Sequence, residues 1–600
     1  MIKFLTYKIV QEDFTMKKVI LVLVTILLFN GCGGGTDSSD EKFGSKTIKV
    51  FAAPGSMTTT NSSLEITLNI SEDITIAKYS IDGTNPKTEG TDFIDKTKIN
   101  ITPSDTAVLK LYVSNGEKEE TNSYYYKNGT APSLISDFNG IRMYQIMVES
   151  FQDGASCGYS SGYGPSLHNG DLRGIINALD YIKSLNVNAI WLTPIFNSVS
   201  TDIKMRATGY YCDDYFNVDP NFGTNEDFRE LVNKAHEKGL YVFLDGVFGH
   251  HGVADIEGVT NLAETGTIGY ATTFPASLDF YKEVATYWIE NYEIDGWRLD
   301  QAYQLYQNNI NYWKNIREAV ETKCQERKNS GNQWGILGYM VGEVWDSNEV
   351  IAKTGYSNNG LYSCFDFPTR YNLVQTLATQ ENITQDGAMN QPASNLNIAL
   401  NNLKSFPFYA KPNLMLTNHD LVRFGDLIQR AKFGYGVENE DYWLRHKAAM
   451  SFLAAYTGPI TIYYGDEIGE EVENFINEKD SGYYDDHVSR SQGRISNLNS
   501  NEENLKKYVS TIMELRNTHP ALWNGSRENL MATSDIFADL KSYNGEEIIY
   551  ILNTATSDKT LDFSSKTIGN CQLKNLFTGE SVSSSTITAK RLTGSFFIKQ

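Results

Sequence analysis

The sequence is short of basic residues and of cysteine, and no apolar run in it is long enough to span a membrane as a helix. Its 600 residues include 52 lysines and arginines against 73 aspartates and glutamates, which gives a formal net charge of -21. A surface with this charge repels phosphate groups, so we expect no nucleic-acid partner, whereas a neutral ligand remains acceptable. The six cysteines and eight histidines show no spacing typical of a zinc site.

The chain does contain ample material for folded cores. Hydrophobic residues make up 41% of it and aromatic residues 12%, and a length of 600 residues favours three or four domains. Its 36 tyrosines and eight tryptophans suit a sugar-binding surface. They suit large hydrophobic cores equally well, so they do not decide the function.

The first 45 residues predict an export signal followed by a tether. A basic start at Met16 leads into an apolar run over residues 19–29, which is shorter than the roughly 20 residues of a membrane-spanning helix. Gly31 and Cys32 follow, and the pattern resembles a bacterial lipoprotein signal that is cleaved before Cys32, the lipidated residue. An ordinary cleaved signal with an incidental cysteine is the alternative. Residues 33–45 are rich in Gly, Ser and Asp and predict a flexible tether.

Residues 46–130 predict a small immunoglobulin-like β-sandwich. Apolar and polar residues alternate over 64–70 and 107–113, and the pairs Asp82-Gly83 and Asn115-Gly116 are typical of hairpin turns. The domain is either a carbohydrate-binding module or a spacer. The tyrosines that would form a stacking platform in the first case, or fill the core in the second, are Tyr79, Tyr124, Tyr125 and Tyr126.

A carboxylate stands beside an arginine in the stretch 292–304, whose apolar residues predict a short strand. Because alternate residues of a strand face the same side, Arg298 and Asp300 point the same way. A guanidinium next to a carboxylate favours the ionised form of that carboxylate.

Three further stretches, residues 240–250, 338–346 and 414–420, share this layout of a short apolar run that ends in polar residues. Catalytic residues at the carboxyl ends of several parallel strands are typical of a (β/α)8 barrel, or TIM barrel. The carboxylates of Asp300, Glu343 and Asp420 would then converge on one face. The other polar residues at these strand ends are Asp245, His250, Asn418 and His419.

One closed parallel barrel is the economical interpretation of the central part of the chain. Further candidate strands, separated by helical patterns, lie at residues 143–148, 188–193, 363–367 and 461–464. We therefore predict an α/β fold with a catalytic barrel over residues 135–525, which carries a short insertion at 251–277. Short strands and turn signals return over residues 526–600 and predict a C-terminal antiparallel β-sandwich.

These motifs resemble the α-amylase family of glycoside hydrolases, family 13. The four signature regions of that family match residues 245–250, 296–300, 342–345 and 418–420, and the similarity covers roughly residues 140–523. The resemblance implies that Asp300 is the nucleophile, Glu343 the general acid/base and Asp420 the transition-state stabiliser. It also implies that Tyr210 stacks on the sugar and that the other substrate-binding residues are Asp245, His250, Arg298, Asn418 and His419.

The chemistry of glycoside cleavage explains why these residue types are needed. Retaining cleavage requires one ionised carboxylate and one protonated carboxyl about 5–5.5 Å apart. Arg298 would keep Asp300 ionised, while Glu343 needs a raised pKa. A neighbouring negative charge and a partly dry aromatic wall at Trp345 would raise that pKa.

We expect no cofactor, because the chain departs from the family at the usual calcium site. Gly249 stands where many members have an asparagine ligand, and Gln304 stands where a histidine often contributes. The loop at 153–157 lacks the alternating oxygen ligands that favour a hard cation. The usual calcium site is therefore predicted to be absent, and a different calcium site built from loop carbonyls stays open.

Two cysteines follow the first two barrel strands. In an exported chain Cys157 and Cys212 could form a disulfide. Beyond these and Cys32 the number of cysteines is odd, so at least one thiol is expected to be free.

We therefore expect an exported enzyme that is lipid-anchored to a bacterial membrane (outer membrane, periplasmic face or cell surface). It would hydrolyse α-glucosidic linkages of starch, maltodextrin or related oligosaccharides by double displacement. One alternative is a transglycosylase or isomerase with the same carboxylates, because the acceptor site decides between water and sugar. A second is a catalytically silent glucan-binding protein, against which the intact carboxylate triad argues. No obligate protein partner is evident.

Overall fold

The architecture is taken from a computed structural model of the chain. It describes residues 48–155, 157–198, 202–252, 256–261, 269–431, 433, 436–472, 475 and 483–600. The predicted signal, the tether and Cys32 lie outside these residues. Across the described part of the chain, no helix combines the length and the apolar character needed to cross a membrane.

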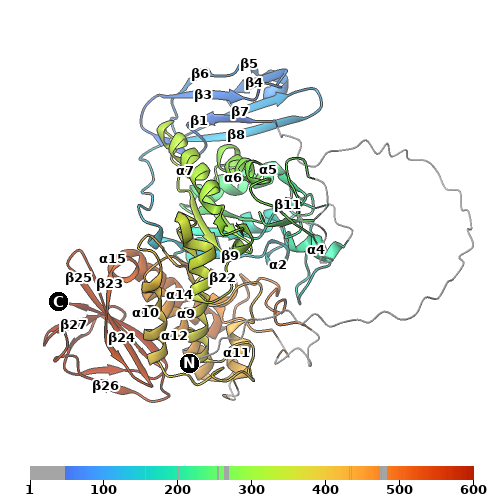
Figure 1. Cartoon of the computed structure of the whole chain (residues 1–600). Helices are drawn as coiled ribbons and strands as arrows, with labels where there is room; N and C mark the ends of the chain where they lie inside the picture. Colours follow the sequence, from blue (N-terminus) through green and yellow to red (C-terminus); the bar gives the residue numbers. More distant parts are fainter. Residues whose placement is uncertain are drawn as a thin grey trace, which may run out of the picture. The chain divides into compact units, whose positions relative to one another are not determined.

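Eight strands form the central barrel (Figure 1). Neighbours pair in the order β20-β19-β16-β13-β10-β9-β22-β21, and all of these pairs are parallel. A parallel bridge between Phe365 and Asn413 joins the two ends of this order, so the ring is closed and the predicted barrel is confirmed. The strands are β9 (Arg142–Ile146), β10 (Ala189–Leu192), β13 (Tyr241–Gly246), β16 (Gly296–Leu299), β19 (Tyr339–Gly342), β20 (Ser363–Cys364), β21 (Leu414–Met415) and β22 (Ile460–Tyr463).

Helices alternate with these strands and begin where the sequence supplies capping residues. The Asp171 side chain accepts a hydrogen bond of 2.7 Å from the Gly174 amide, and Thr224 forms a capping box with Asp227. The helices are α3 (Leu172–Ser184), α5 (Asn225–Glu237), α6 (Leu278–Tyr292), α7 (Trp313–Asn329), α9 (Phe367–Leu377), α11 (Phe424–Arg430), α12 (Glu440–Ala455) and α14 (Ser500–Thr518).

Two barrel strands are shorter than predicted because a helix begins early. The first strand ends at Ile146, since α2 (Val148–Phe151) follows it directly. The sixth strand ends at Cys364, because the Asp366 side chain accepts from the Thr369 amide and starts α9. Apolar runs at strand ends therefore continue into helices here, which periodicity alone does not distinguish.

The N-terminal domain consists of two sheets with a shared core. Tyr124 and Tyr126 are fully buried, and their hydroxyls donate to the carbonyls of Val50 and Pro54 at 3.2 and 2.9 Å. These two tyrosines fill the core, so they cannot form a stacking platform. One sheet contains β1 (Val50–Ala53), β3 (Leu64–Ile70) and β6 (Thr97–Ile101), and the other β2 (Thr58–Thr60), β8 (Glu119–Asn128), β7 (Thr106–Ser114), β4 (Ile76–Ser80) and β5 (Thr91–Asp92).

Hydrogen bonds from its backbone amides to side chains attach this domain near the amino-terminal ends of barrel strands. The Gly55 amide donates to Asn332 at 2.6 Å, shortly before β19, and the Ser56 amide donates to Glu293 at 2.8 Å, shortly before β16.

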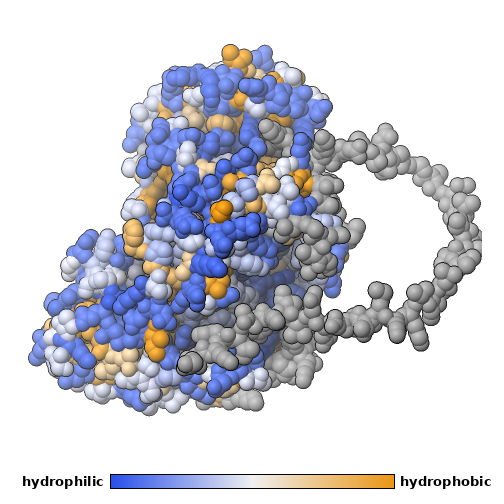
Figure 2. Space-filling model, in the orientation of Figure 1, coloured by the Kyte–Doolittle hydropathy of each residue, from blue (hydrophilic) through white to orange (hydrophobic). Residues whose placement is uncertain are grey.

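On the face drawn in Figure 2, hydrophilic residues predominate and hydrophobic ones occur in small groups, in keeping with the acidic composition.

The C-terminal domain packs its central strands on helix α12. The hydroxyls of Ser451 and Tyr550 are 2.8 Å apart, and a Cβ atom at Gly594 would lie only 1.8 Å from the Ser451 hydroxyl, so glycine is required there. Its main sheet has the order β23 (Ser526–Ala532), β24 (Ile536–Tyr543), β25 (Glu546–Asn553), β30 (Thr593–Lys599), β27 (Gln572–Asn575) and β28 (Ser581–Ser583), and β26 (Lys559–Leu561) pairs with β29 (Ile587–Ala589).

The disulfide considered between Cys157 and Cys212 is not formed. Both residues are free, as are the other cysteines among the described residues. The Cys157 thiol instead donates to the Asp171 carboxylate at 3.3 Å. Burial, together with that carboxylate, raises the pKa of Cys157 to about 11, so the thiol stays protonated.

We expect Asp466→Asn to stabilise the protein at neutral pH. Asp466 is buried in the short 3-10 helix (Asp466–Ile468) that follows β22. Its Oδ1 accepts a hydrogen bond from the Thr417 hydroxyl at 2.5 Å, and its Oδ2 has no hydrogen-bond partner. Burial raises its pKa from 3.8 to about 7. The stability that the protonated Asp466 carboxyl contributes is fully present below pH 4 and is lost as the pH rises towards 7. The loss is about 1.4 kcal/mol for each unit by which the pKa in the folded protein exceeds that in the unfolded chain.

Urea unfolding at several pH values checks this expectation. The gain of the asparagine variant over the wild type should grow from pH 4 to pH 7 and stay constant above it. The exposed Asp386→Asn serves as the control and should show no such growth. A gain that did not change with pH would contradict a raised pKa at Asp466.

Candidate active site

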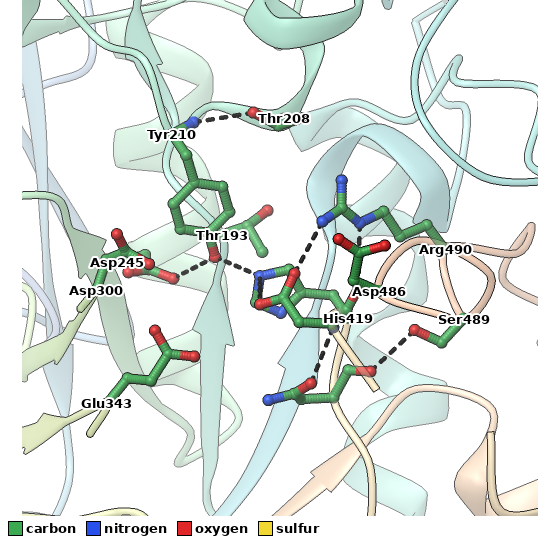
Figure 3. Close-up of polar contacts among 12 residues, drawn as sticks. Thr193, Thr208, Tyr210, Asp245, Asp300, Glu343, His419, Asp486, Ser489 and Arg490 are labelled. Atoms are coloured by element: carbon green, nitrogen blue, oxygen red, sulfur yellow. Dashed lines mark hydrogen bonds and ion pairs between the residues drawn. The ribbon is translucent and has the colours of Figure 1, made fainter. Parts of the chain in front are cut away.

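The polar residues predicted at strand ends do converge at the carboxyl ends of the barrel strands. Asp245 lies on β13, Arg298 on β16 with Asp300 directly after it, and Glu343 directly after β19. Figure 3 shows Tyr210, Asp245, Asp300, Glu343 and His419 around one space. Because the strands are parallel, residues as far apart in sequence as Asp245 and Glu343 reach the same rim.

Arg298 is the centre of this cluster and has no exposed surface. Its Nη1 contacts both oxygens of Asp245 at 2.8 Å and Oδ1 of Asp300 at 3.1 Å, while its Nη2 lies 2.9 Å from Oε1 of Glu343. Trp191 contacts both Asp245 and Arg298: its indole N–H donates to Asp245 at 3.2 Å, and its ring centroid lies 5.0 Å from the guanidinium carbon of Arg298. One cation therefore faces three carboxylates.

This shortage of positive charge changes the expected protonation. The sequence predicts that Arg298 keeps Asp300 ionised, but burial raises the pKa of Asp300 well above its ordinary value, and the charges of Glu343 and Asp245 add to the rise. Burial also raises the pKa of Glu343 and brings that of Asp245 to about 6. Because the charge of Glu343 raises the pKa of Asp300, loss of a proton from one of these two carboxyls disfavours loss from the other, which suits a reaction in which one attacks and the other donates.

Trp345 does not have the environment expected of a dry wall beside Glu343. Its indole is 43% exposed, stacks on Phe367 with 5.3 Å between ring centroids, and donates to the Tyr371 hydroxyl at 2.9 Å. Glu343 is nevertheless only 6% exposed, so its burial does not require a buried tryptophan.

A chain of hydrogen bonds links β9 to Asp245 through His419 and Tyr210. Gln145 donates to Nδ1 of His419 at 2.7 Å, and Nε2 of His419 lies 2.7 Å from the Tyr210 hydroxyl, which donates to Asp245 at 2.8 Å. Burial lowers the pKa of His419 to about 3, so the ring is neutral and its Nε2–H donates to Tyr210. The rings of Tyr210 and His419 stack at 5.3 Å, so a sugar can stack only on the opposite face of Tyr210.

Asp420 is held by Arg490, a residue that the sequence reasoning missed. Arg490 donates to Oδ1 of Asp420 at 2.8 Å and to the His419 carbonyl at 3.1 Å, and the Asp420 amide donates to Asn418 at 2.9 Å. Burial opposes ionisation of Asp420, but the neighbouring positive charges outweigh it, so the pKa is lowered. Asp420 is therefore held in its anionic form.

Arg490→Met should lower kcat/KM by about 10- to 100-fold, because a charge-assisted hydrogen bond to Asp420 is lost. Without that charge the pKa of Asp420 rises, so the acid limb of the pH–rate profile should move to higher pH. Arg490→Lys should restore part of the loss. The matched control is Arg494→Met, which removes a partly exposed ion pair with Glu502. An acid limb that stays in place would contradict the assignment.

The last predicted residue, His250, lies at the edge of the cluster. Its Nε2 is 3.9 Å from Oδ2 of Asp300, and its Nδ1 is 3.1 Å from the side-chain oxygen of Gln304. Where residues are described, no group of three His, Cys, Asp or Glu side chains is arranged to hold a metal ion.

Comparisons with known proteins found a matching family model and several relatives. The family model described as "Alpha amylase, catalytic domain" matches residues 145–260 and 272–548. A cyclomaltodextrinase of Thermoanaerobacter pseudethanolicus is 27% identical over 481 residues, 72% of either chain. An intracellular maltogenic amylase of Bacillus subtilis is 29% identical over 333 residues, 51% of this chain and 50% of that relative.

Solved structures extend the likeness to three dimensions. The crystal structure of AmyP in complex with maltose is 43% identical with a TM-score of 0.71, and covers 77% of this chain and 96% of that one. A glutamate-to-glutamine variant of AmyP in complex with maltotriose matches with 44% identity and the same TM-score of 0.71.

Proposed function

Because this chain belongs to the alpha-amylase family of glycoside hydrolases, we propose that it hydrolyses α-glucosidic linkages of starch, maltodextrin or related oligosaccharides with retention. The observation that carries the proposal is the pair Asp300 and Glu343, which lie at the carboxyl ends of neighbouring barrel strands and both form ion pairs with Arg298, at 3.1 and 2.9 Å. Relatives named as amylases and cyclomaltodextrinases support hydrolysis, and AmyP structures hold maltose and maltotriose. They do not favour the transglycosylase or isomerase alternative.

The reaction would proceed in two displacements. Asp300 attacks the anomeric carbon while Glu343 protonates the leaving oxygen, which gives a covalent glycosyl-enzyme. Glu343, now ionised, takes a proton from water, which attacks the same carbon from the opposite side and releases Asp300. Asp420 stays ionised because of Arg490, and its negative charge favours the positively charged transition state.

Proton NMR of residues 45–600 with maltoheptaose tests the proposal, and isomaltose and sucrose test the linkage. Two inversions at one carbon restore its configuration, so the α-anomer of the product should appear first. Early β-anomer would contradict double displacement. Longer chains or new linkages would indicate transglycosylation instead, and binding without turnover would indicate a silent glucan-binding protein.

We further propose that the mature chain is exported and anchored through a lipid on Cys32. The support is the basic, apolar and Gly31-Cys32 pattern in residues 16–35, which lie outside the described structure. Labelling with a radioactive fatty acid in a bacterial host should mark the wild type and leave Cys32→Ala unmarked. Equal labelling of both would contradict the anchor.

A further inference from the structure

Three glutamines form a ladder in the turn that directly follows Asp300. Gln301 precedes a 3-10 helix (Ala302–Leu305), Gln304 lies in it, and Gln307 follows it in the short strand β17 (Tyr306–Gln307). The Gln304 side-chain NH2 donates to the Gln301 side-chain oxygen at 3.1 Å, and the Gln307 NH2 donates to the Gln304 carbonyl at 3.0 Å. This glutamine ladder connects the loop of the nucleophile to its neighbours.

The middle glutamine determines which nitrogen of His250 carries a proton. Because the Gln304 NH2 is used by Gln301, its oxygen faces Nδ1 of His250 at 3.1 Å, and an amide oxygen only accepts. Burial lowers the pKa of His250, so the ring is neutral with its proton on Nδ1. The bare Nε2 then lies towards Oδ2 of Asp300, an oxygen without a hydrogen-bond partner.

Gln304 can adopt this position only because residue 249 is glycine. A Cβ atom at Gly249 would lie 2.0 Å from the Gln304 side-chain oxygen and 2.6 Å from its Cβ. Glycine at 249 and glutamine at 304 therefore act as one unit, in which the carboxamide fills the space that a side chain at 249 would take. A calcium ligand from residue 249 does not fit this arrangement.

We propose that Gln304 is a positioning residue that replaces the family's calcium ion in fixing the loop of His250. It holds His250 in the form whose Nε2 accepts a hydrogen bond from a hydroxyl of the sugar that Asp300 attacks. This inference rests on the proposed function. The other titratable groups near His250 are Asp300, 3.9 Å from its Nε2, its neighbour His251, and Tyr211, whose ring centroid is 5.9 Å away. The Tyr210 backbone also hydrogen-bonds the His250 ring, and the Gln304 oxygen is the side-chain partner of Nδ1.

Two substitutions of Gln304 distinguish the role of its acceptor oxygen from the role of its side-chain shape. Gln304→Met keeps the length and removes the hydrogen bonds, whereas Gln304→Glu keeps an acceptor for the His250 N–H. At pH 8 we expect kcat/KM on maltoheptaose to fall by about 10-fold in Gln304→Met and by less in Gln304→Glu. In 15N NMR spectra of labelled histidine, Gln304→Met should show His250 as a mixture of tautomers.

Gln307→Met is the matched control on the next rung of the ladder. Its side chain hydrogen-bonds the backbones of Thr272, Phe274 and Gln304, at 2.9, 2.9 and 3.0 Å, and has no hydrogen bond to His250 or to the Gln304 side chain. We expect an unchanged tautomer and nearly unchanged kcat/KM. An equal loss in both methionine variants, or a wild-type tautomer in Gln304→Met, would overturn the proposal.

The role of calcium is tested on the wild-type protein. Treatment with EDTA should leave the His250 signal in place, and added calcium should not shift it. A signal that disappears with EDTA and returns with calcium would show that an ion holds this loop. The tautomer is measured without substrate, so it still tests Gln304 if the protein proves to have no glycosidase activity.

Discussion

Glu343→Gln should lower the turnover of maltoheptaose by about 10²- to 10⁴-fold while oligosaccharide binding persists. The substitution keeps the size of the side chain and removes the proton that the leaving oxygen needs. It also keeps an oxygen that can face Arg298, which lies 2.9 Å from Glu343. The loss should therefore appear in kcat and not in the dissociation constant of maltotriose, measured by calorimetry.

A substrate that needs no proton distinguishes the acid from a structural residue. Fluoride leaves without protonation, so α-maltosyl fluoride should form the glycosyl-enzyme at a nearly normal rate in Glu343→Gln. The control is Glu349→Gln, the same exchange on an exposed site in α8 (Asn348–Ile351). If the variant lost maltosyl fluoride and maltoheptaose equally, Glu343 would not be the acid.

Asp300→Ala should lower turnover by more than about 10³-fold on both substrates, because without the nucleophile no covalent intermediate forms. The nature of the leaving group does not matter to this defect, which separates it from the defect of Glu343→Gln. Rapid-quench mass spectrometry should find a glycosylated peptide containing Asp300 in the wild type and none in the variant.

Azide provides a second test of the same assignment. The shortened side chain leaves room for a small anion beside Arg298, on the side from which Asp300 would attack. Added azide should restore part of the turnover and yield the β-glycosyl azide, since a single displacement inverts the anomeric carbon. Asp346→Ala, an exposed site near Glu343, should keep wild-type activity. Formation of the α-azide would place the nucleophile elsewhere.

The strand pattern of the sequence predicts the site residues that lie at the ends of barrel strands. Asp245, Arg298, Asp300 and Glu343 stand at or directly after short apolar runs, so parallel pairing brings them to one rim. Arg490 follows no such run and reaches Asp420 from a loop that is 70 residues further along the chain. Only the folded backbone joins these two residues, so periodicity gives no signal for the contact.

Charge in the site was harder to predict than position. A single pair, Arg298 and Asp300, implies an ionised nucleophile, but the structure divides the same guanidinium among further carboxylates and removes it from water. The neutral His419 likewise depends on burial, which strand patterns do not report. Local motifs therefore identify the groups, while their protonation depends on how many of them share one cation.

Sharing one guanidinium also determines how variants at this site combine. If the charge of Asp245, Asp300 or Glu343 is removed, Arg298 pairs with fewer carboxylates. The pKa of each remaining carboxyl is then lowered. Effects of single substitutions in this group should consequently not add in double variants, and a double-mutant cycle should give a coupling energy well above its error. The three carboxylates and their arginine act as one unit, and exchanging a single member changes the acidity of the others.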